Sequence, residues 1–427
     1  MRVPRRSLAR TEVTDLRGRV RVQDVRHRLV RTSSRRGDRR RPGPGGGAWP
    51  VSDDAAGFTR LLELLAEHRD GEDGPVEIAI ESDKGLFVAG LVAAGFTVFA
   101  INPRAVARYR ERYGQAGGKS DPGDAGVLAN ILRTDRHVHR PLPADSELVR
   151  AVKTCARQHQ EAIWARQQAM NRLRSLLHDY YPQALQAFPN LAHRAAANVL
   201  RAVPTPQAAQ RLTPARVVAL LKKAGRRNDP GLAEAISTTL RAPALRQPAP
   251  VEHALGVAAV GLIEVITAMS DAIAALEAEL ATVFDEHQQA AVITSQPGLG
   301  PVLGARVLGE LGDDPRRFTD TAGLRSFAGT APITRASGRS LIVTSRRICN
   351  RRLGDACHWW AFAAITKSPG ARAHYDHRRA AGDTHNAALR NLANKLLAKL
   401  WHCLQTGTLY NEATAWPASP TPKQAAA

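Results

Sequence analysis

The chain has 427 residues, of which 44% are hydrophobic and 23% charged, and its formal net charge is +21 at pH 7. This length has room for two or three domains, and the hydrophobic fraction is that of a folded protein. No continuous apolar run predicts a membrane span, and the basic start lacks the apolar segment of a secretory signal. The basic balance favours a polyanionic partner, because each cation placed on a phosphate releases counterions.

Four cysteines are widely separated, and none belongs to a Cys-x-x-Cys pair: Cys155, Cys349, Cys357 and Cys403. This usage is typical of a reducing compartment and excludes a disulfide framework. The spacing of Cys349, Cys357 and His358 does not match a structural zinc site. We therefore expect a cytoplasmic protein without zinc.

Residues 1–52 do not have the pattern of a folded domain. The first 50 residues hold fifteen arginines, no lysine and four acidic residues, and they end in a run of glycine and proline. Such a composition is typical of a disordered basic arm.

An α/β pattern occupies residues 53–145. The expected elements in order are an amphipathic helix over 58–65, a buried strand over 76–81, a helix over 86–94 and a strand over 97–101. Strand, helix and strand in this order predict a parallel pair with a crossover helix. A further helix begins at Lys119-Ser120-Asp121-Pro122, with Asp121 suited to the N-cap and Pro122 to the first helical position.

A helical spacer is expected over residues 146–290. Apolar positions from Val149 to Tyr180 alternate in steps of three and four, which is a heptad seam. The seam can pair with a later helix of the same chain or with a second subunit, and the intramolecular pairing is favoured.

A mainly helical domain is expected over 291–412, followed by a disordered tail over 413–427. Its turn Pro297-Gly298-Leu299-Gly300 precedes a helix over 302–311 and has the form of a helix-hairpin-helix element, whose glycines bring backbone N–H groups to a phosphate. The alternative is an ordinary connection between two helices. Trp359 and Trp360 are expected in the core rather than as platforms for base stacking.

Three carboxylates have the pattern of a metal site. Glu81 ends a strand, where open α/β sheets place their ligands, and Asp121 and Asp124 share one face of a helix start. Together they predict oxygen ligands for Mg²⁺, which supports phosphoryl transfer. Taken singly, Asp121 is as easily explained as a cap and Glu81 as a surface residue.

A serine lies between arginines at Arg335-Ala336-Ser337-Gly338-Arg339, in a segment expected to be a mobile loop. Ser337 is a candidate nucleophile for a phosphodiester, with the arginines offsetting charge in the transition state. The alternative is a loop that only binds phosphate. The candidate nucleic-acid contacts are Lys119, Gly298, Gly300, Arg335, Arg339, Arg346 and Arg347.

The ordered set of motifs resembles one family. The segments that carry the resemblance are Ile78-Ala79-Ile80-Glu81, Ala100-Ile101-Asn102-Pro103, Lys119-Ser120-Asp121 with Asp124-Ala125, Asn171-Arg172-Leu173-Arg174, Pro297-Gly298-Leu299-Gly300, Leu311-Gly312-Asp313, Phe327-Ala328-Gly329 with Ala331-Pro332, Ser337-Gly338 and His374-Tyr375-Asp376. From about residue 53 to 412 the chain is similar to insertion-sequence transposases of the IS-one-ten type, relatives of Piv-type DNA invertases.

The resemblance implies an N-terminal RuvC-like domain of the ribonuclease H fold with a DEDD carboxylate set, a helical spacer and a C-terminal serine domain. Glu81, Asp121 and Asp124 match the second, third and fourth acids, and Ser337 matches the serine, with Ser340 as the fallback. It further implies DNA recombination through a serine–DNA link with Mg²⁺, a guide RNA, and a homo-oligomer, dimer or tetramer, with no membrane partner.

The departure from the family lies in its first acid, which belongs to an opening strand that residues 1–50 do not contain. Codons chosen for residues 27–36 can be read from the second base as Ile-Asp-Trp-Ser-Glu-His-Leu-His-Asp, which has the family's pattern. We therefore expect that residues 1–52 are read out of frame and that the chain is catalytically impaired. Two other interpretations stay open: a metal-only RuvC-like nuclease, and a nucleic-acid-binding remnant.

Overall fold

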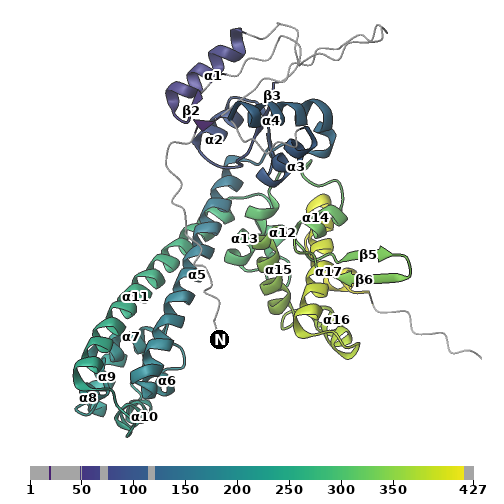
Figure 1. Ribbon diagram of the computed structural model, residues 1–427. Coiled ribbons are helices and arrows are strands. Elements are labelled where there is room, and N and C mark those ends of the chain that lie inside the picture. Colours follow the sequence, from purple (N-terminus) through teal and green to yellow (C-terminus); the bar gives the residue numbers. More distant parts are fainter. Residues whose placement is uncertain (1–18, 21–48, 50, 68–75, 114–120, 418–427) are drawn as a thin grey trace, which may run out of the picture. The chain divides into compact units, whose positions relative to one another are not determined.

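The computed structural model describes residues 19–20, 49, 51–67, 76–113 and 121–417, without the side chains of residues 19, 20, 113, 121 and 122. The chain divides into two units, residues 1–143 and 144–427. The out-of-frame hypothesis for residues 1–52 falls almost entirely outside the described residues. Figure 1 traces both units, and each is described by itself below.

The first unit is built on two parallel strands. In order its elements are β1 (Arg19–Val20), β2 (Val51–Ser52), α1 (Ala55–Glu67), β3 (Glu77–Ile80), α2 (Leu86–Ala93), β4 (Thr97–Ala100), α3 (Pro103–Tyr113), α4 (Asp121–Asp135) and the 3-10 turn η1 (Arg136–Val138). β3 pairs with β4 in parallel, with Ile78 opposite Val98, and β1 pairs with β2 antiparallel. The predicted parallel pair is confirmed.

Both faces of the β3–β4 pair are covered, which is why its strands are apolar throughout. Ile78 and Val98 pack on the side of α1 and α2, whereas Ala79 and Phe99 pack on the side of α3 and α4. Helix α3 is rich in arginine and has no counterpart in the sequence prediction. The RuvC-like fold stays a prediction, because the described strands form only two-stranded sheets.

The second unit starts with a long helical hairpin. α5 (Glu147–Tyr180) and α11 (Ala249–Asp285) run alongside each other (Figure 1), and α5 buries Val149, Val152 and Ala156 of the heptad seam. Five helices close the far end of the hairpin: α6 (Pro182–Ala187), α7 (Arg194–Ala202), α8 (Pro206–Ala209), α9 (Pro214–Lys223) and α10 (Pro230–Arg241). The intramolecular pairing predicted for the seam is therefore confirmed.

Helix α11 corrects one expectation from the sequence. By length and composition alone it is apolar enough to cross a membrane, the one such helix among the described residues. Its apolar residues are interrupted by Gly261 and Glu264, so no continuous run marks it in the sequence. One face carries Ala259, Ile263 and Ile266 into the core shared with α5, so this face belongs to the protein interior.

Helices dominate the rest of the second unit. They are α12 (Ala290–Thr294), α13 (Pro301–Leu311), α14 (Thr321–Phe327), α15 (Arg351–Ala364), α16 (Pro369–Ala380), α17 (His385–Thr406) and α18 (Glu412–Ala415). Trp360 of α15 is fully buried among them, but Trp359 is 51% exposed, so the expectation that both lie in the core is wrong for Trp359. Residues 413–417, assigned to a tail, hold the end of α18 and Trp416, whose ring lies beside His374.

A β-hairpin takes the place of the expected mobile loop around Ser337. β5 (Ile333–Ser337) pairs antiparallel with β6 (Ser340–Thr344), with Ser337 opposite Ser340. Gly338 occupies the left-handed region at φ 55°, which a two-residue hairpin turn requires. The sequence signal for the strands is weak, because the arginine and serine residues of β5 obscure the alternation of apolar and polar residues that predicts a strand.

An ion pair centred on the buried Glu310 joins α5 of the helical hairpin to α13. Glu310 of α13 is 4% exposed and accepts hydrogen bonds from Arg157 Nε at 2.6 Å and from Asn350 Nδ2 at 2.7 Å. Burial acts to raise the pKa of the Glu310 carboxyl, but these hydrogen bonds outweigh it and hold the pKa below its ordinary value of 4.5. The ionised carboxylate therefore stabilises the fold above about pH 4.5, and this contribution is lost as the pH falls through the folded-state pKa.

Replacing Glu310 by Ala should lower the free energy of unfolding by about 3 kcal/mol, because the partly buried Arg157 and Asn350 would lose their carboxylate acceptor. The ion pair between Arg352 and the exposed Glu161 supplies the control, and Glu161→Ala should cost less than about 1 kcal/mol because that carboxylate is solvated. Denaturant titrations followed by circular dichroism measure both. Equal losses of unfolding free energy in the two variants would contradict this account. So would a Glu310→Ala protein whose stability falls with decreasing pH in the same way as that of the wild type.

Candidate active site

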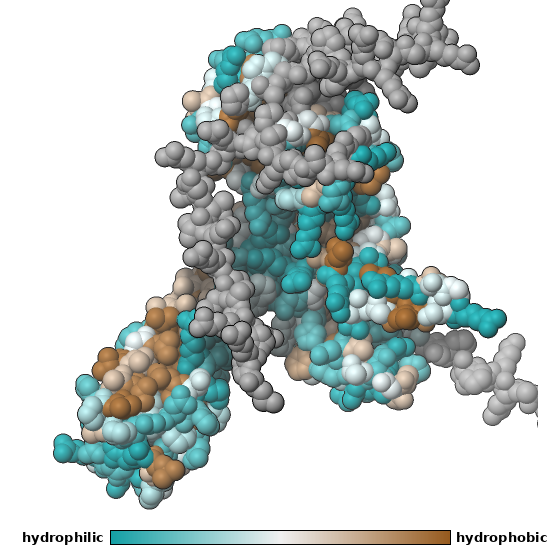
Figure 2. All heavy atoms as spheres, viewed as in Figure 1, coloured by the Kyte–Doolittle hydropathy of each residue, from teal (hydrophilic) through white to brown (hydrophobic). Residues whose placement is uncertain are grey.

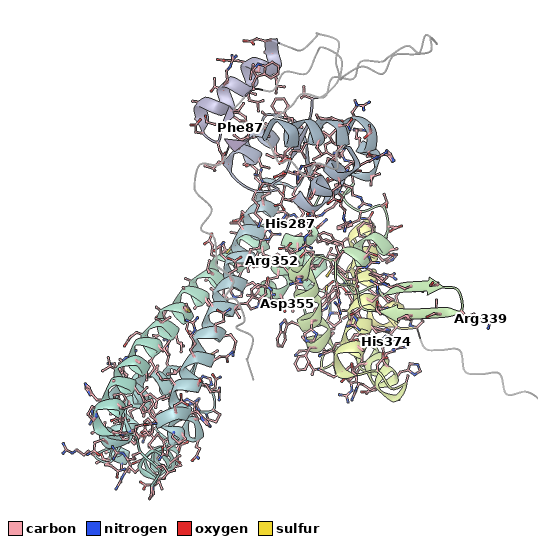
Figure 3. The ribbon with its side chains drawn as sticks, in the orientation of Figure 1. Phe87, His287, Arg339, Arg352, Asp355 and His374 are labelled. Carbon is pink, nitrogen blue, oxygen red and sulfur yellow. The ribbon has the colours of Figure 1, made fainter. Side chains whose placement is uncertain are left out.

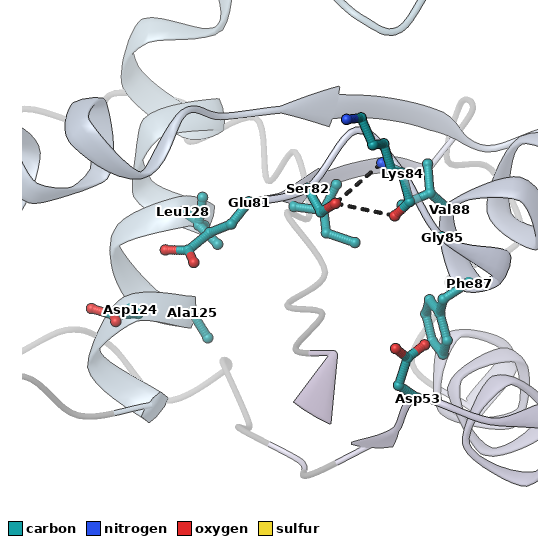
Figure 4. Close-up of a pocket in the computed structure, with 11 residues that line it drawn as sticks. Asp53, Glu81, Ser82, Lys84, Gly85, Phe87, Val88, Asp124, Ala125 and Leu128 are labelled. Carbon is teal, nitrogen blue, oxygen red and sulfur yellow. Dashed lines mark hydrogen bonds between the residues drawn. The ribbon is translucent and has the colours of Figure 1, made fainter. Parts of the chain in front are cut away.

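A pocket of about 240 Å³ lies in the first unit, at the carboxyl end of β3. Its lining includes three carboxylates, from Asp53, Glu81 and Asp124, together with Ser82 and Lys84. In the view of Figure 4 the Glu81 and Asp124 carboxylates lie on the same side of the pocket, and Asp53 lies across from them beside Phe87. Two of the predicted acids therefore line one hollow.

Glu81 reaches the pocket because the buried strand β3 ends at Ile80. The chain then turns through Ser82, whose hydroxyl accepts from the Lys84 N–H and donates to the Lys84 carbonyl, both at 3.1 Å. Gly85 follows at φ 107° and begins α2. The Glu81 side chain is exposed and forms no ion pair with a described residue, so its oxygens face the pocket unshared.

Asp124 comes to the same pocket from the first turns of α4. It is 7% exposed, and its Oδ1 accepts a hydrogen bond from Arg110 Nε at 2.9 Å and another from the same guanidinium. Arg110 belongs to α3, the helix that the sequence analysis missed. The pairing compensates a buried carboxylate and leaves Oδ2 without a described partner.

Two predicted residues cannot be placed in the pocket. Lys119 lies outside the described residues, and of Asp121 the structure describes only the backbone, at the start of α4. Sequence reasoning missed Asp53, Lys84 and Arg110 as neighbours of the acids. Only the fold brings them there, since none belongs to a motif.

The pocket's donor set fits a hard divalent cation. Magnesium takes oxygen ligands and is held by one or two carboxylates, with water and substrate phosphate completing its shell. Glu81 and one oxygen of Asp124 meet this requirement. Among the described side chains no group of three acidic, His or Cys residues is close enough to hold a metal ion by itself.

The predicted serine lies in the second unit, at the turn of the β5–β6 hairpin. Because directly opposite residues of an antiparallel pair share a face, Ser337 and Ser340 are on the same face beside Gly338 and Arg339. Figure 3 shows Arg339 at the projecting end of the hairpin. Ser337 is exposed and has no hydrogen bond to a described side chain, so no general base accompanies it within its own hairpin.

The hairpin carries cations and unusually exposed apolar residues. Arg335 is exposed on β5, and Arg347 follows β6, with Arg346 partly buried beside it. Leu341 is 69% exposed. An isolated two-stranded hairpin is only marginally stable in water, so a bound partner would stabilise this one.

The two glycines of the Pro297–Gly300 turn differ in role. Gly298 lies at φ 86°, and a Cβ there would come within 2.8 Å of the Ala364 backbone nitrogen, so it serves packing against α15. Gly300 caps α13, is exposed and has open space around it. The structure has the expected order of helix, turn and helix, formed by α12, the Pro297–Gly300 turn and α13. Of the two glycines only Gly300 is exposed, and a phosphate contact requires exposure.

Comparison with known proteins decides the family. The chain is 49% identical over 371 residues to the Streptomyces coelicolor protein named as a mini-circle transposase for IS117, covering 86% of this chain and 90% of that protein. The chain belongs to the IS110/IS116/IS117 family of insertion-sequence transposases. Two further members, an IS900 protein of Mycobacterium paratuberculosis and an IS110 protein of Streptomyces coelicolor, are 30% and 31% identical over 86% and 74% of the chain and 92% and 78% of their own lengths.

The family match falls on both candidate sites. Residues 48–182 match the DEDD transposase domain of the IS110 family, and they include the carboxylate pocket. Residues 290–376 match the transposase IS116/IS110/IS902 family, and they include the serine hairpin. Transposases act on DNA, and a DEDD domain indicates use of a divalent metal ion. The chain is thus an insertion-sequence transposase with a DEDD domain and a second transposase domain.

Proposed function

We propose that this transposase recombines DNA with Ser337 as the nucleophile and with Glu81, Asp121 and Asp124 as acids that hold Mg²⁺. The observation that carries the proposal is the pocket in which Glu81 and Asp124 meet at the end of β3, inside the matched DEDD domain. DNA, as the element ends and the target, is the proposed partner, and the net charge of +21 favours it.

In the proposed reaction the hydroxyl oxygen of Ser337 attacks a backbone phosphate. A phosphoserine diester forms to one DNA end and the other strand end leaves as a hydroxyl. Rejoining reverses the step with a new DNA hydroxyl. A bound magnesium ion would supply Lewis-acid stabilisation of the phosphate charge. Arg335 and Arg339 flank the serine in the chain and would offset that charge, with Arg346 and Arg347 holding the backbone nearby.

The proposed metal site can be tested without catalysis. Titration with Mn²⁺, followed by its electron paramagnetic resonance signal, should show a site that Glu81→Gln weakens by on the order of tenfold or more, because one of the two described carboxylates assigned to the metal would be lost. Asp83→Asn is the matched control, since Asp83 is a neighbouring exposed acid that does not line the pocket. Equal weakening by both variants would contradict the assignment.

We further propose a homo-oligomer in which the serine domain of one subunit completes the carboxylate site of another. Two features favour it: Ser337 lacks a base in its own hairpin, and α11 has a second apolar seam facing solvent. The exposed residues of this seam follow one another in steps of three and four: Val251, Ala254, Ala258, Gly261, Val265, Ala268, Ala272 and Ala275. Figure 2 shows apolar residues gathered over the lower part of this helix.

A seam of small residues at heptad spacing suits close pairing with the same helix of a second copy. Introducing Glu at both Ala258 and Ala268 should therefore reduce the mass measured by light scattering from that of an oligomer to that of a monomer. Ala278→Glu, an exposed position of α11 off the seam, should leave the mass unchanged. An unchanged mass in the double variant would exclude this interface.

A guide RNA is the proposed source of target choice. A basic protein without an obvious base-reading helix fits this role, because phosphate contacts position a nucleic acid without reading its sequence. We also propose a cytoplasmic location without a membrane partner. The four cysteines are free, which agrees with a reducing compartment.

A second candidate function is a nucleic-acid-binding remnant of the family. The observation that favours it is that no three described metal-ligating side chains meet in the pocket. The family match also begins at residue 48, beyond most of the arginine-rich segment. Binding of DNA without cleavage under Mg²⁺ would support this alternative for the chain as printed.

A further inference from the structure

Five rings form a continuous aromatic ridge on the surface of the second unit. The ridge consists of His358, Trp359 and Phe362 of α15, Tyr375 of α16 and His385 of α17. Trp359 and Phe362 lie edge to face with ring centroids 6.1 Å apart, and Phe362 meets His385 in the same way at 6.4 Å. Tyr375 Oη and His385 Nδ1 are hydrogen-bonded at 2.8 Å. The rings are therefore held in fixed positions by three helices.

The ridge faces water, although aromatic rings of this size are normally buried. Trp359 and Phe362 are each 51% exposed, whereas Trp360 beside them is fully buried and donates its indole N–H to the Pro297 carbonyl at 2.9 Å. The core of α15 is thus complete without Trp359 and Phe362. Their exposure has no structural purpose within the described chain.

The surroundings of the ridge are basic. Residues 351–406, which span α15 to α17 and their connections, carry nine Lys and Arg residues against three Asp and no Glu. All three Asp are paired with arginines of the same helices or of α13. Lys367, which follows α15, and Arg390 of α17 are exposed and form no ion pair with a described residue. Exposed rings on helices whose surface also carries unpaired cations are a combination that binds single-stranded nucleic acid, because bases stack on the rings and phosphates meet the cations.

A protein partner fits the ridge less well. A stable protein interface buries about 800 Å² on each partner. Two half-exposed aromatic rings offer roughly 200 Å² together, since such a ring buries about 150–250 Å² in full. We propose that the ridge is a stacking platform for unpaired bases of DNA or RNA. It shares no residue with the carboxylate pocket or the serine hairpin and goes beyond the chemistry proposed for them.

The test measures binding of a fluorescent oligothymidylate and of a duplex by anisotropy, in the full chain. Trp359→Ala combined with Phe362→Ala should weaken single-strand binding about tenfold or more, and change duplex binding by less than about twofold. Leu409→Ala, which removes an equally exposed apolar side chain outside the ridge, should change neither. The combination of Trp359→Phe and Phe362→Tyr keeps both rings and should restore the affinity.

A second readout separates stacking from a structural effect. Single-strand binding should quench tryptophan emission in the wild type, and Trp359→Phe should keep the affinity but lose this quenching. Binding unchanged in the double alanine variant would overturn the proposal. So would equal losses for single strand and duplex, or a loss of oligomer mass, which would identify a protein contact instead. RNA and DNA oligonucleotides of one sequence show which source of unpaired bases is preferred.

Discussion

A reframed chain, in which residues 27–36 are replaced by the second-frame sequence Ile-Asp-Trp-Ser-Glu-His-Leu-His-Asp, should cut and rejoin DNA faster than the printed chain. The expected gain is on the order of 10²–10³-fold. The physical reason is the missing first acid of the family's DEDD set. The described pocket offers Glu81 and one oxygen of Asp124, and no three ligands meet there. A strand carrying Asp-Trp-Ser-Glu would add a carboxylate to the set, and would also widen a parallel sheet that now has two described strands.

The measurement is strand transfer between DNA carrying the element ends and a target, in the presence of Mg²⁺ and any required guide RNA. The control is the reframed chain with the restored Asp replaced by Asn, which should fall back to the rate of the printed chain. If the reframed chain is no faster, residues 1–52 do not conceal the first acid, and the binding-remnant interpretation gains support.

Ser337→Ala in the reframed chain should abolish strand joining and the covalent protein–DNA product, by roughly 10⁴-fold or more, as when a nucleophile is removed from other enzymes. Ser340→Ala is the matched control, because Ser340 lies directly opposite on the same face of the hairpin turn. It should leave both products in place.

The outcomes for the two serines separate the alternatives. If Ser340→Ala removes the covalent product and Ser337→Ala does not, the nucleophile is Ser340. If both variants still cut DNA under Mg²⁺ but neither forms a covalent product, the protein is a metal-only nuclease of the RuvC-like type. In that case water, not serine, attacks the phosphate.

The parallel pair and the helical hairpin could be predicted because the burial of each leaves a regular pattern of apolar residues in the sequence. β3 and β4 are buried on both faces and therefore read as continuous apolar runs. The seam of α5 repeats in steps of three and four because it packs along α11, with α13 beside its first turns. In both cases local pattern and tertiary environment agree.

Other features depend on contacts between distant residues and leave no local signal. Arg110 is one of several arginines in α3, and only the fold selects it as the partner of Asp124. Trp359 and Trp360 are adjacent and chemically identical, yet the rotation of α15 buries one and exposes the other. Asp53 reaches the pocket only because β2 and α1 pack beside α2. Sequence spacing alone does not distinguish these residues from their neighbours.

The most direct test of the central claim is mass spectrometry of the covalent intermediate. The reframed chain would be incubated with element-end DNA and Mg²⁺, digested with nuclease and protease, and searched for a nucleotide linked to protein. The account predicts a phosphodiester on the hydroxyl of Ser337, absent from Glu81→Gln. A nucleotide on any other residue, or free DNA ends with no adduct at all, would contradict it.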